Sequence, residues 1–561
     1  MYVRTWKVGQ KQDMRTLAAA VALLILMFPA PPPFAAGQPA TPGSFGFVST
    51  GNLDFAAIRR AGGRAVKITA DWSEIEAERG AFRWTDLDAA IRAAGAAGLT
   101  VTVVLAYTPQ WASIGAGVEL KDRAIFSRQP ARHLEDWEAF VRKAVTRYRT
   151  RVKDWQVWTA LSLPAWRGTP KDYIRYLTAT RKSTQAADPQ SRVVLATPHG
   201  LDLVWVNRMV REAGESFDAV SLAPRGVEPE ALLRPLRVLH EQVLVGRSTR
   251  VWLEWDPRSS GDRVGWSGEI LKVAAIARAL EVDRVDWVID PTLAASALQL
   301  FATHVGTKTP AGHLISPRAL ALVFGQTSTA AVAWSAEGGG ELPLSSGGLT
   351  VITATGETRS PEGQDALTLR PDPVILTGLD EAVVAAAGAL RAQGLGPPGA
   401  RDFSGAAEVS ARLGRANVED GLYNARFRSR RNGALEAVDF DGGEAVRTNA
   451  GKDVVYAYFD VDDSFIFFVN GRHPVEVTVE VRGASAPKQL GFNLLYDSMK
   501  DYRFTEWQWV DAKDGWLTYT FRLPDAAFAN SWGWDFAINA AGNRREDLTI
   551  RSVTVRRSNL R

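Results

Sequence analysis

The stretch Trp155–Tyr173 reads WQVWTALSLPAWRGTPKDY and combines a strand, a loop and the start of a helix. Its apolar beginning predicts a short strand, and a loop rich in proline and glycine follows. Thr169 is the predicted N-cap of a helix, and Pro170 would occupy its first position. The stretch is therefore one strand–loop–helix unit of a larger alternating fold.

The residues after this strand are Thr159, Ala160, Leu161 and Ser162. In a barrel of alternating strands and helices, chemistry is located at the C-terminal ends of the strands. None of these four side chains titrates in the physiological range. The function of the chain depends on this absence.

The same alternation extends from about residue 43 to residue 300. Helical stretches separate the predicted strands, and eight such units over ~250 residues are typical of a (β/α)8 TIM barrel. A doubly wound sheet is the alternative, but VSTGNLD after the first strand is not a glycine-rich phosphate loop. The predicted strands are Phe45–Val48, Val66–Thr69, Val101–Ala106, Trp155–Trp158, Val193–Ala196, Ala219–Leu222, Val251–Glu254 and Val285–Ile289.

Beyond the barrel the pattern becomes that of short strands. Residues 301–393 predict a small β appendage with strands at Ala330–Trp334, Leu349–Ala354 and Ala366–Leu369, followed by a helix over Asp380–Gln393. Residues 394–401 contain GLGPPG and form a linker. Residues 402–561 alternate in short strands rich in aromatic residues, which predicts an all-β sandwich.

The N-terminal residues 1–36 have the pattern of a signal peptide. A basic flank precedes an unbroken apolar run from Leu17 to Phe28, which is too short to span a bilayer. Cleavage near Ala36 or Gly37 would leave no membrane span, and Met14 is an alternative start. An uncleaved anchor is the other interpretation, and both place the body of the protein outside the cytoplasm as an exported protein.

Composition excludes several classes of function. The formal charge of +4 comes mostly from the N-terminus, because the chain after residue 36 has 62 basic and 61 acidic residues. Such a body lacks the positive surface that nucleic acid requires. There is no cysteine, which excludes disulfides, a thiol nucleophile and thiolate zinc sites. The six histidines show no metal-ligand spacing, so we expect neither a metal nor a cofactor.

Carboxylates and aromatic side chains gather at the predicted strand ends. Glu254 ends the seventh strand, and three further carboxylates follow strand ends at Asp71, Asp256 and Asp290. Aromatic rings beside carboxylates suit a sugar, which stacks its C–H face on a ring and binds acids through its hydroxyls. The predicted substrate contacts are Lys67, Trp72, Tyr107, Trp111, His199, Trp255 and Trp287.

Several of these segments resemble clan A retaining glycoside hydrolases, closest to family 39 and its family 5 relatives. The matching segments include DWSEIEAERGAFRWTDLDAAIRAAGAAGL, TPQWAS, WRGTPKDYIRYL, FDAVSLAP and VWLEW, in family order over residues 44–300. The resemblance implies cleavage of a glycoside or polysaccharide by two glutamates. Glu254 occupies the place of the nucleophile at the end of strand seven. The acid/base glutamate would follow an asparagine at the end of strand four.

The chain departs from the family at that second position. Thr159 and Ala160 stand where the family has its Asn-Glu pair, Lys67 stands where arginine is usual, and Ala223 where histidine is usual. A retaining mechanism needs two carboxyl groups about 5–5.5 Å apart. Loss of a general acid typically costs about 10²–10⁴-fold in rate.

Three interpretations follow. The protein is a glycan-binding relative without hydrolysis, or a hydrolase with Asp71, Asp256 or Asp290 as a substitute acid. In the third interpretation it is a scaffold in a polysaccharide assembly or export system. The expected partner is a polysaccharide or oligosaccharide, specifically a bacterial exopolysaccharide or cell-surface glycan. The sequence leaves the sugar, the linkage and the oligomeric state undefined.

The predicted sandwich resembles the β-sandwich modules attached to bacterial polysaccharide-active proteins. Asp460, Asp462 and Asp463 have oxygen ligands of the kind that calcium takes, although no glycine-spaced calcium loop accompanies them. A solvated acidic turn is therefore the favoured interpretation. The tryptophans of this module form either a sugar platform or part of the core, and they are Trp507, Trp509, Trp516, Trp532 and Trp534.

Overall fold

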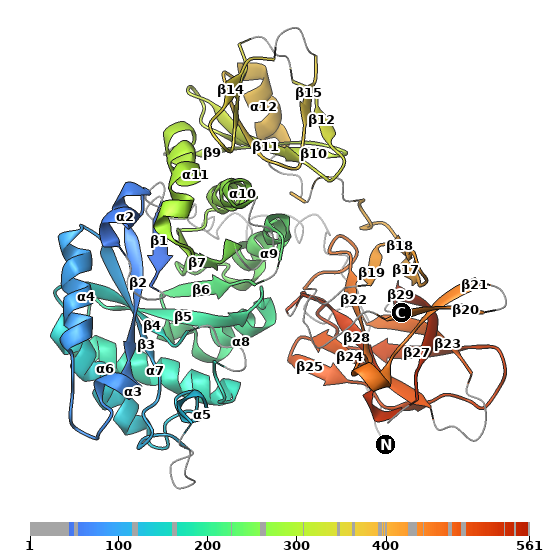
Figure 1. The fold of residues 1–561 in the computed structure, drawn as a ribbon, viewed down its shortest axis with the longest axis horizontal. Helices are drawn as coiled ribbons and strands as arrows, with labels where there is room; N and C mark the ends of the chain where they lie inside the picture. The colour runs from blue at the N-terminus through green and yellow to red at the C-terminus, as the bar shows by residue number, and fades with distance from the viewer. Residues whose placement is uncertain are drawn as a thin grey trace, which may run out of the picture. The chain divides into compact units, whose positions relative to one another are not determined.

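Eight parallel strands close into a barrel in which every strand pairs with its neighbours in the chain (Figure 1). The predicted barrel is confirmed, and each predicted strand overlaps an observed one. The strands are β1 (Phe45–Val48), β2 (Ala65–Asp71), β3 (Thr100–Ala106), β4 (Val152–Val157), β5 (Arg192–His199), β6 (Ala219–Ala223), β7 (Arg250–Trp255) and β8 (Arg284–Trp287).

This computed structural model describes most of the chain beyond residue 43. The described residues are 44–49, 54–114, 122–159, 165–225, 227–257, 265–306, 308–344, 348–361, 365–390, 395–396, 398, 401–424, 435–440, 443–468, 474–483, 490–531, 533–543 and 546–558. The predicted signal peptide and Ala160, Leu161 and Ser162 lie outside them. Within them, no helix combines the length and the hydropathy that crossing a bilayer requires.

The barrel closes between β1 and β8, where a glycine makes room for an acid. Gly46 pairs with Ala65 of β2 on one side and Asp286 of β8 on the other. A Cβ atom on Gly46 would lie 2.1 Å from Oδ1 of Asp286, a distance that no side chain can adopt. The glycine in FGFV therefore allows a buried carboxylate at the closing seam.

Helices surround the barrel and bury an apolar face against it (Figure 1). The helix after β4 begins as predicted, because Thr169 accepts from the Asp172 amide and Asp172 accepts from the Thr169 amide in a capping box. The helices are α2 (Phe55–Arg60), α3 (Trp72–Ile75), α4 (Thr85–Ala96), α5 (Arg123–Phe126), α6 (Leu134–Tyr148), α7 (Pro170–Ala187), α8 (Leu203–Ala213), α9 (Leu233–Val238), α10 (Trp266–Ala279) and α11 (Pro291–His304).

The appendage has more strands than the sequence predicts. The described residues form one six-stranded sheet, ordered β14-β13-β16-β11-β10-β9, and a β12–β15 pair. Its helix α12 (Glu381–Leu390) lies within the predicted range. The bounds are β9 (Pro310–Ser316), β10 (Ala319–Phe324), β11 (Ala330–Ser335), β12 (Gly340–Leu342), β13 (Thr350–Thr353), β14 (Thr358–Arg359), β15 (Leu367–Leu369) and β16 (Val374–Thr377).

Two antiparallel sheets form the predicted sandwich around their own apolar core. Strand β23 (Val475–Arg482) alternates buried and half-buried residues throughout, as the sequence predicts. The other strands are β17 (Glu408–Arg412), β18 (Val418–Asp420), β19 (Leu422–Asn424), β20 (Glu436–Phe440), β21 (Gly443–Arg447), β22 (Tyr456–Val461), β24 (Gly491–Ser498), β25 (Asp501–Phe504), β26 (Gln508–Trp509), β27 (Trp516–Leu523), β28 (Phe536–Asn539) and β29 (Thr549–Arg557).

Candidate functional site

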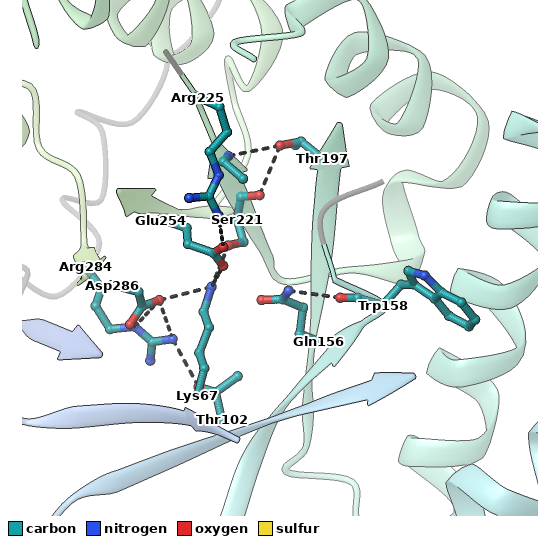
Figure 2. Close-up of polar contacts among 11 residues, drawn as sticks. Lys67, Thr102, Gln156, Trp158, Thr197, Ser221, Arg225, Glu254, Arg284 and Asp286 are labelled. Carbon is teal, nitrogen blue, oxygen red and sulfur yellow. Dashed lines mark hydrogen bonds and ion pairs between the residues drawn. The ribbon is translucent and has the colours of Figure 1, made fainter. Parts of the chain in front are cut away.

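Glu254 lies near the end of β7, and a cation contacts each of its carboxylate oxygens. Lys67 Nζ of β2 is 3.3 Å from Oε2, and Arg225 Nη2 after β6 is 3.4 Å from Oε1. The Glu254 side chain is only 12% exposed, so water screens these charges weakly. Figure 2 shows the three side chains converging. The glutamate is thus held between two cations.

The lysine extends the cluster across the barrel. Lys67 is 1% exposed, and its Nζ is also 2.7 Å from Ser221 Oγ and 3.2 Å from Asp286 Oδ2. Asp286 is fully buried and pairs with Arg284, whose Nη2 donates to Thr102 Oγ1 (Figure 2). Buried charges persist only when paired and hydrogen-bonded. Asp286 Oδ2 meets both conditions through Arg284, whereas Oδ1 accepts no hydrogen bond within the described residues.

Arg225 links a third carboxylate to the same cluster. Its Nη1 donates to Asp256 Oδ2 at 2.7 Å while Nη2 faces Glu254. The cluster therefore holds three cations and three carboxylates, and its formal charge is zero. The six members are Lys67, Arg225, Glu254, Asp256, Arg284 and Asp286.

Near the end of β4, Gln156 has an amide side chain shortly before Thr159 and Ala160, where the resemblance expects a catalytic pair. Gln156 Nε2 donates to the Trp158 carbonyl at 3.0 Å, and its buried Oε1 has no hydrogen-bond donor within the described chain. In Figure 2 this oxygen points toward the side of Gln156 on which Lys67 lies. Trp158 itself has a positive φ of 69°, a conformation that non-glycine residues rarely adopt outside functional loops. The strand thus ends in a constrained turn before Thr159.

Thr159 is half-buried, and its Oγ1 lies 3.5 Å from the hydroxyl of Tyr107 after β3. The structure therefore brings one predicted contact residue to the degenerate position. Ala160 lies outside the described residues, so its surroundings stay a prediction. His199 ends β5 opposite Ala223, and its side chain is likewise outside the description.

Three of the predicted sugar contacts belong to the core, which corrects the sequence interpretation. Trp72 and Trp287 have no exposed surface, and Trp255 is 2% exposed. Trp72 donates to Glu76 Oε2 and packs among other aromatic rings, while Trp255 donates to Glu269 Oε1. A buried ring cannot stack on a sugar.

Trp111 remains half-buried, with Nε1 donating to the Glu76 carbonyl and Arg79 over its ring. Lys67 also differs from its predicted role, because its amine is committed to the buried cluster.

The outlying carboxylates Asp71 and Asp290 act as helix caps. Asp71 accepts from the Ser73 amide at the start of α3 and pairs with Arg123. Asp290 accepts from the amide and hydroxyl of Thr292, and these hydrogen bonds lower its pKa below the ordinary value. A general acid needs a raised pKa, so Asp290 is unsuited to that role.

Sequence reasoning missed Arg225, which contacts Glu254, and the pair Asp286 and Arg284, which joins the cluster through Lys67. The pattern Arg-x-Asp in β8 places two charges on one face of a strand that is otherwise apolar, and that was the available signal. Arg225 had no comparable signal, because a single arginine in a loop is ordinary. Among the described residues, no group of three or more metal-ligating side chains forms a metal site, the sandwich aspartates included.

In (β/α)8 barrels the functional residues lie at the C-terminal ends of the strands, and Glu254 lies at the end of β7. The solved structures to which the chain is similar are glycoside hydrolases. A family 39 glycoside hydrolase from Bacteroides cellulosilyticus shares 16% identity, with 61% of this chain and 81% of that chain covered and a TM-score of 0.49. A family 39 β-xylosidase from Caulobacter crescentus shares 15% identity over 60% and 96% of the two chains, with a TM-score of 0.44.

A third similar structure spans more of the chain. A glucosidase from Croceicoccus marinus shares 12% identity over 93% of this chain and 97% of its own, with a TM-score of 0.39. No family model and no curated protein matches the sequence. Because the TM-scores are below 0.5, the fold assignment rests on the strand order and register of the barrel itself.

Proposed function

We propose that this is an exported glycan-binding protein on a glycoside hydrolase-like barrel, with hydrolysis altered or lost. Its ligand would be a bacterial exopolysaccharide or cell-surface glycan. The observation that carries the proposal is the pairing of both Glu254 oxygens with cations, Lys67 on one and Arg225 on the other. The departure from the Asn-Glu pair at Thr159 and Ala160 supports it.

The physical argument concerns the reactivity of Glu254. A carboxylate nucleophile attacks through an oxygen lone pair, and a cation on each oxygen withdraws charge from both. Arg225 is itself held by Asp256 at 2.7 Å, so it is anchored rather than swinging away. Without a partner acid, leaving groups that need protonation would depart slowly. Glycan would then bind at the mouth of the barrel and stay bound without being hydrolysed.

The test is turnover of aryl glycosides with activated leaving groups, with and without azide. We expect no turnover of natural polysaccharide by the full chain and retention of at least one polysaccharide in affinity electrophoresis. Arg225→Ala should raise azide-dependent turnover, because one cation leaves the carboxylate, and Glu254→Ala should abolish it. Glu135→Ala, at an exposed position in the first turn of α6, is the matched control.

Two outcomes would overturn the proposal. Rapid hydrolysis of a natural glycan without azide would show that another carboxylate acts as the acid. Failure to retain any polysaccharide across a broad panel would remove the binding function.

A further inference from the structure

A cavity separate from the Glu254 cluster lies where the loops after β4 and β5 meet the sandwich. It measures about 390 Å³, within the ~300–1,000 Å³ range of small-ligand sites. None of the six cluster residues lines it. Its walls come from the β4–α7 loop, from the end of β5 with α8, and from β24 and the segments beside it.

Backbone contact joins the barrel and the sandwich beside this cavity. Gly200, just after β5, has a φ of 114°, and a Cβ there would lie 2.3 Å from the carbonyl oxygen of Ser531. Phe467, Phe468 and Ala527 of the sandwich belong to the same buried apolar cluster as the barrel. The two domains therefore share a packed junction, and the cavity is part of it.

Aromatic rings form the apolar part of the cavity wall. Trp166 and Trp205 come from the barrel and Tyr502 from the sandwich. Trp166 is held edge-to-face against Trp158, with ring centroids 4.7 Å apart. The indole N–H groups of Trp166 and Trp205 are buried, and neither finds an acceptor in the described parts of the chain. The rings of Trp205 and Tyr502 are only half-buried, and such rings suit the C–H faces of a sugar.

Three cations complete the wall. Arg167 and Arg208 come from the barrel and Lys500 from the sandwich. Arg208 bonds Glu212 through Nε at 3.0 Å. The side chains of Arg167 and Lys500 form no ion pair with any described carboxylate. The positive charges of Arg167 and Lys500 are therefore available to pair with an anionic ligand in the cavity.

The two acids of the cavity are already engaged within the protein. Asp202 accepts from the Trp205 amide at 2.7 Å as the N-cap of α8. Asp497 is 1% exposed and accepts from the Ala529 amide and the Ser531 hydroxyl. These carboxylates position the walls, and they leave the cations to face the cavity contents.

We propose that this cavity binds an acidic saccharide through a uronate residue, with the barrel and the sandwich each supplying half of the site. The sugar ring would lie against the half-buried Trp205 and Tyr502, and Arg167 and Lys500 would pair with its carboxylate. This inference deepens the proposed glycan binding by naming a site and a ligand class, and it holds whether or not Glu254 turns over a substrate.

The experiment is isothermal titration of the full chain with oligomers of galacturonate, glucuronate and mannuronate. The matched ligands are the same oligomers with their carboxyl groups methyl-esterified, which keeps the rings and removes the charge. At least one acidic oligomer should bind, and its ester should bind at least tenfold more weakly. Raising salt from 50 to 500 mM should weaken the acidic oligomer alone.

Variants then locate the site. Arg167→Ala and Lys500→Ala should each raise Kd about tenfold, one from each domain, while Lys452→Ala on the exposed sandwich surface should not. Glu254→Ala should leave this Kd unchanged, which separates the cavity from the barrel mouth. The proposal is overturned if none of the oligomers binds, if the esters bind equally well, or if either cavity variant binds like the unaltered chain.

Discussion

Replacing Lys67 with methionine removes the central cation of the buried cluster and keeps most of the side-chain volume. The amine has three partners, at 2.7 Å from Ser221, 3.2 Å from Asp286 and 3.3 Å from Glu254. With the amine gone, the three carboxylates of the cluster remain against two arginines, so the cluster becomes net negative. We expect the barrel to lose stability.

The magnitude follows from burial. Removing one partner of a buried pair costs about 3–5 kcal/mol, and Lys67 is 1% exposed. Because Arg284 and Arg225 stay in place, the lower end, about 3 kcal/mol, is expected. The measurement is the urea midpoint of the barrel transition followed by tryptophan near-ultraviolet circular dichroism. The double variant Lys67→Met with Glu254→Gln restores neutrality, so it should recover about 1–3 kcal/mol relative to additivity.

A matched control separates burial from the loss of any lysine. Lys153 pairs with Asp188 at 2.6 Å but is 34% exposed, so Lys153→Met should cost less than about 1 kcal/mol. If Lys67→Met proves as mild as Lys153→Met, the cluster does not stabilise the barrel. Simple additivity in the double variant would show that Lys67 and Glu254 do not interact.

Two further predictions concern the barrel seam and the sandwich. Gly46→Ala should destabilise the barrel in thermal unfolding, because its Cβ would displace the Asp286 carboxylate that lies 2.1 Å from that position. Gly95→Ala in α4 is the steric control, because Gly95 has open space around it and no positive φ. Burial raises the pKa of Asp460 to about 7, so the folded chain binds a proton that the unfolded chain releases above pH ~4. Stability should fall as pH rises between these values, and Asp460→Asn should reduce that slope in urea unfolding at pH 5 and pH 8. Part of the slope should remain, because burial also raises the pKa values of Asp463 and Asp535.

The fold could be predicted because alternation of strand and helix leaves periodic signals. The eight barrel strands are short apolar runs separated by amphipathic helices, and each prediction overlaps its observed strand. Strand β10 escaped prediction because ALALVF is buried on both faces and therefore shows no alternation. Strand β9 contains both Pro310 and Gly312, which weaken any strand signal.

The site could be predicted only in part. Glu254 was found from its place at the end of a strand, which topology alone determines. Its partners Lys67 and Arg225 come from β2 and from the segment after β6, and an ion pair between residues so far apart in the sequence leaves no local pattern. The prediction for Trp72 was wrong because tryptophan at a strand end is typical of both a sugar platform and a core, and Trp72 is buried in the core.

The charge cluster also constrains the order in which the strands of the barrel assemble. Lys67 precedes Glu254 by 187 residues, so a chain synthesised from its N-terminus contains this lysine long before Glu254 has been added. Gly46 and Asp286 meet only when the first and last strands join. Burying the lysine before that point would leave an unpaired charge in an apolar interior, which is unfavourable in free energy. Neutralisation of the Lys67 charge and closure of the barrel are therefore one event. The cost of burying an unpaired charge disfavours closure of an incomplete barrel.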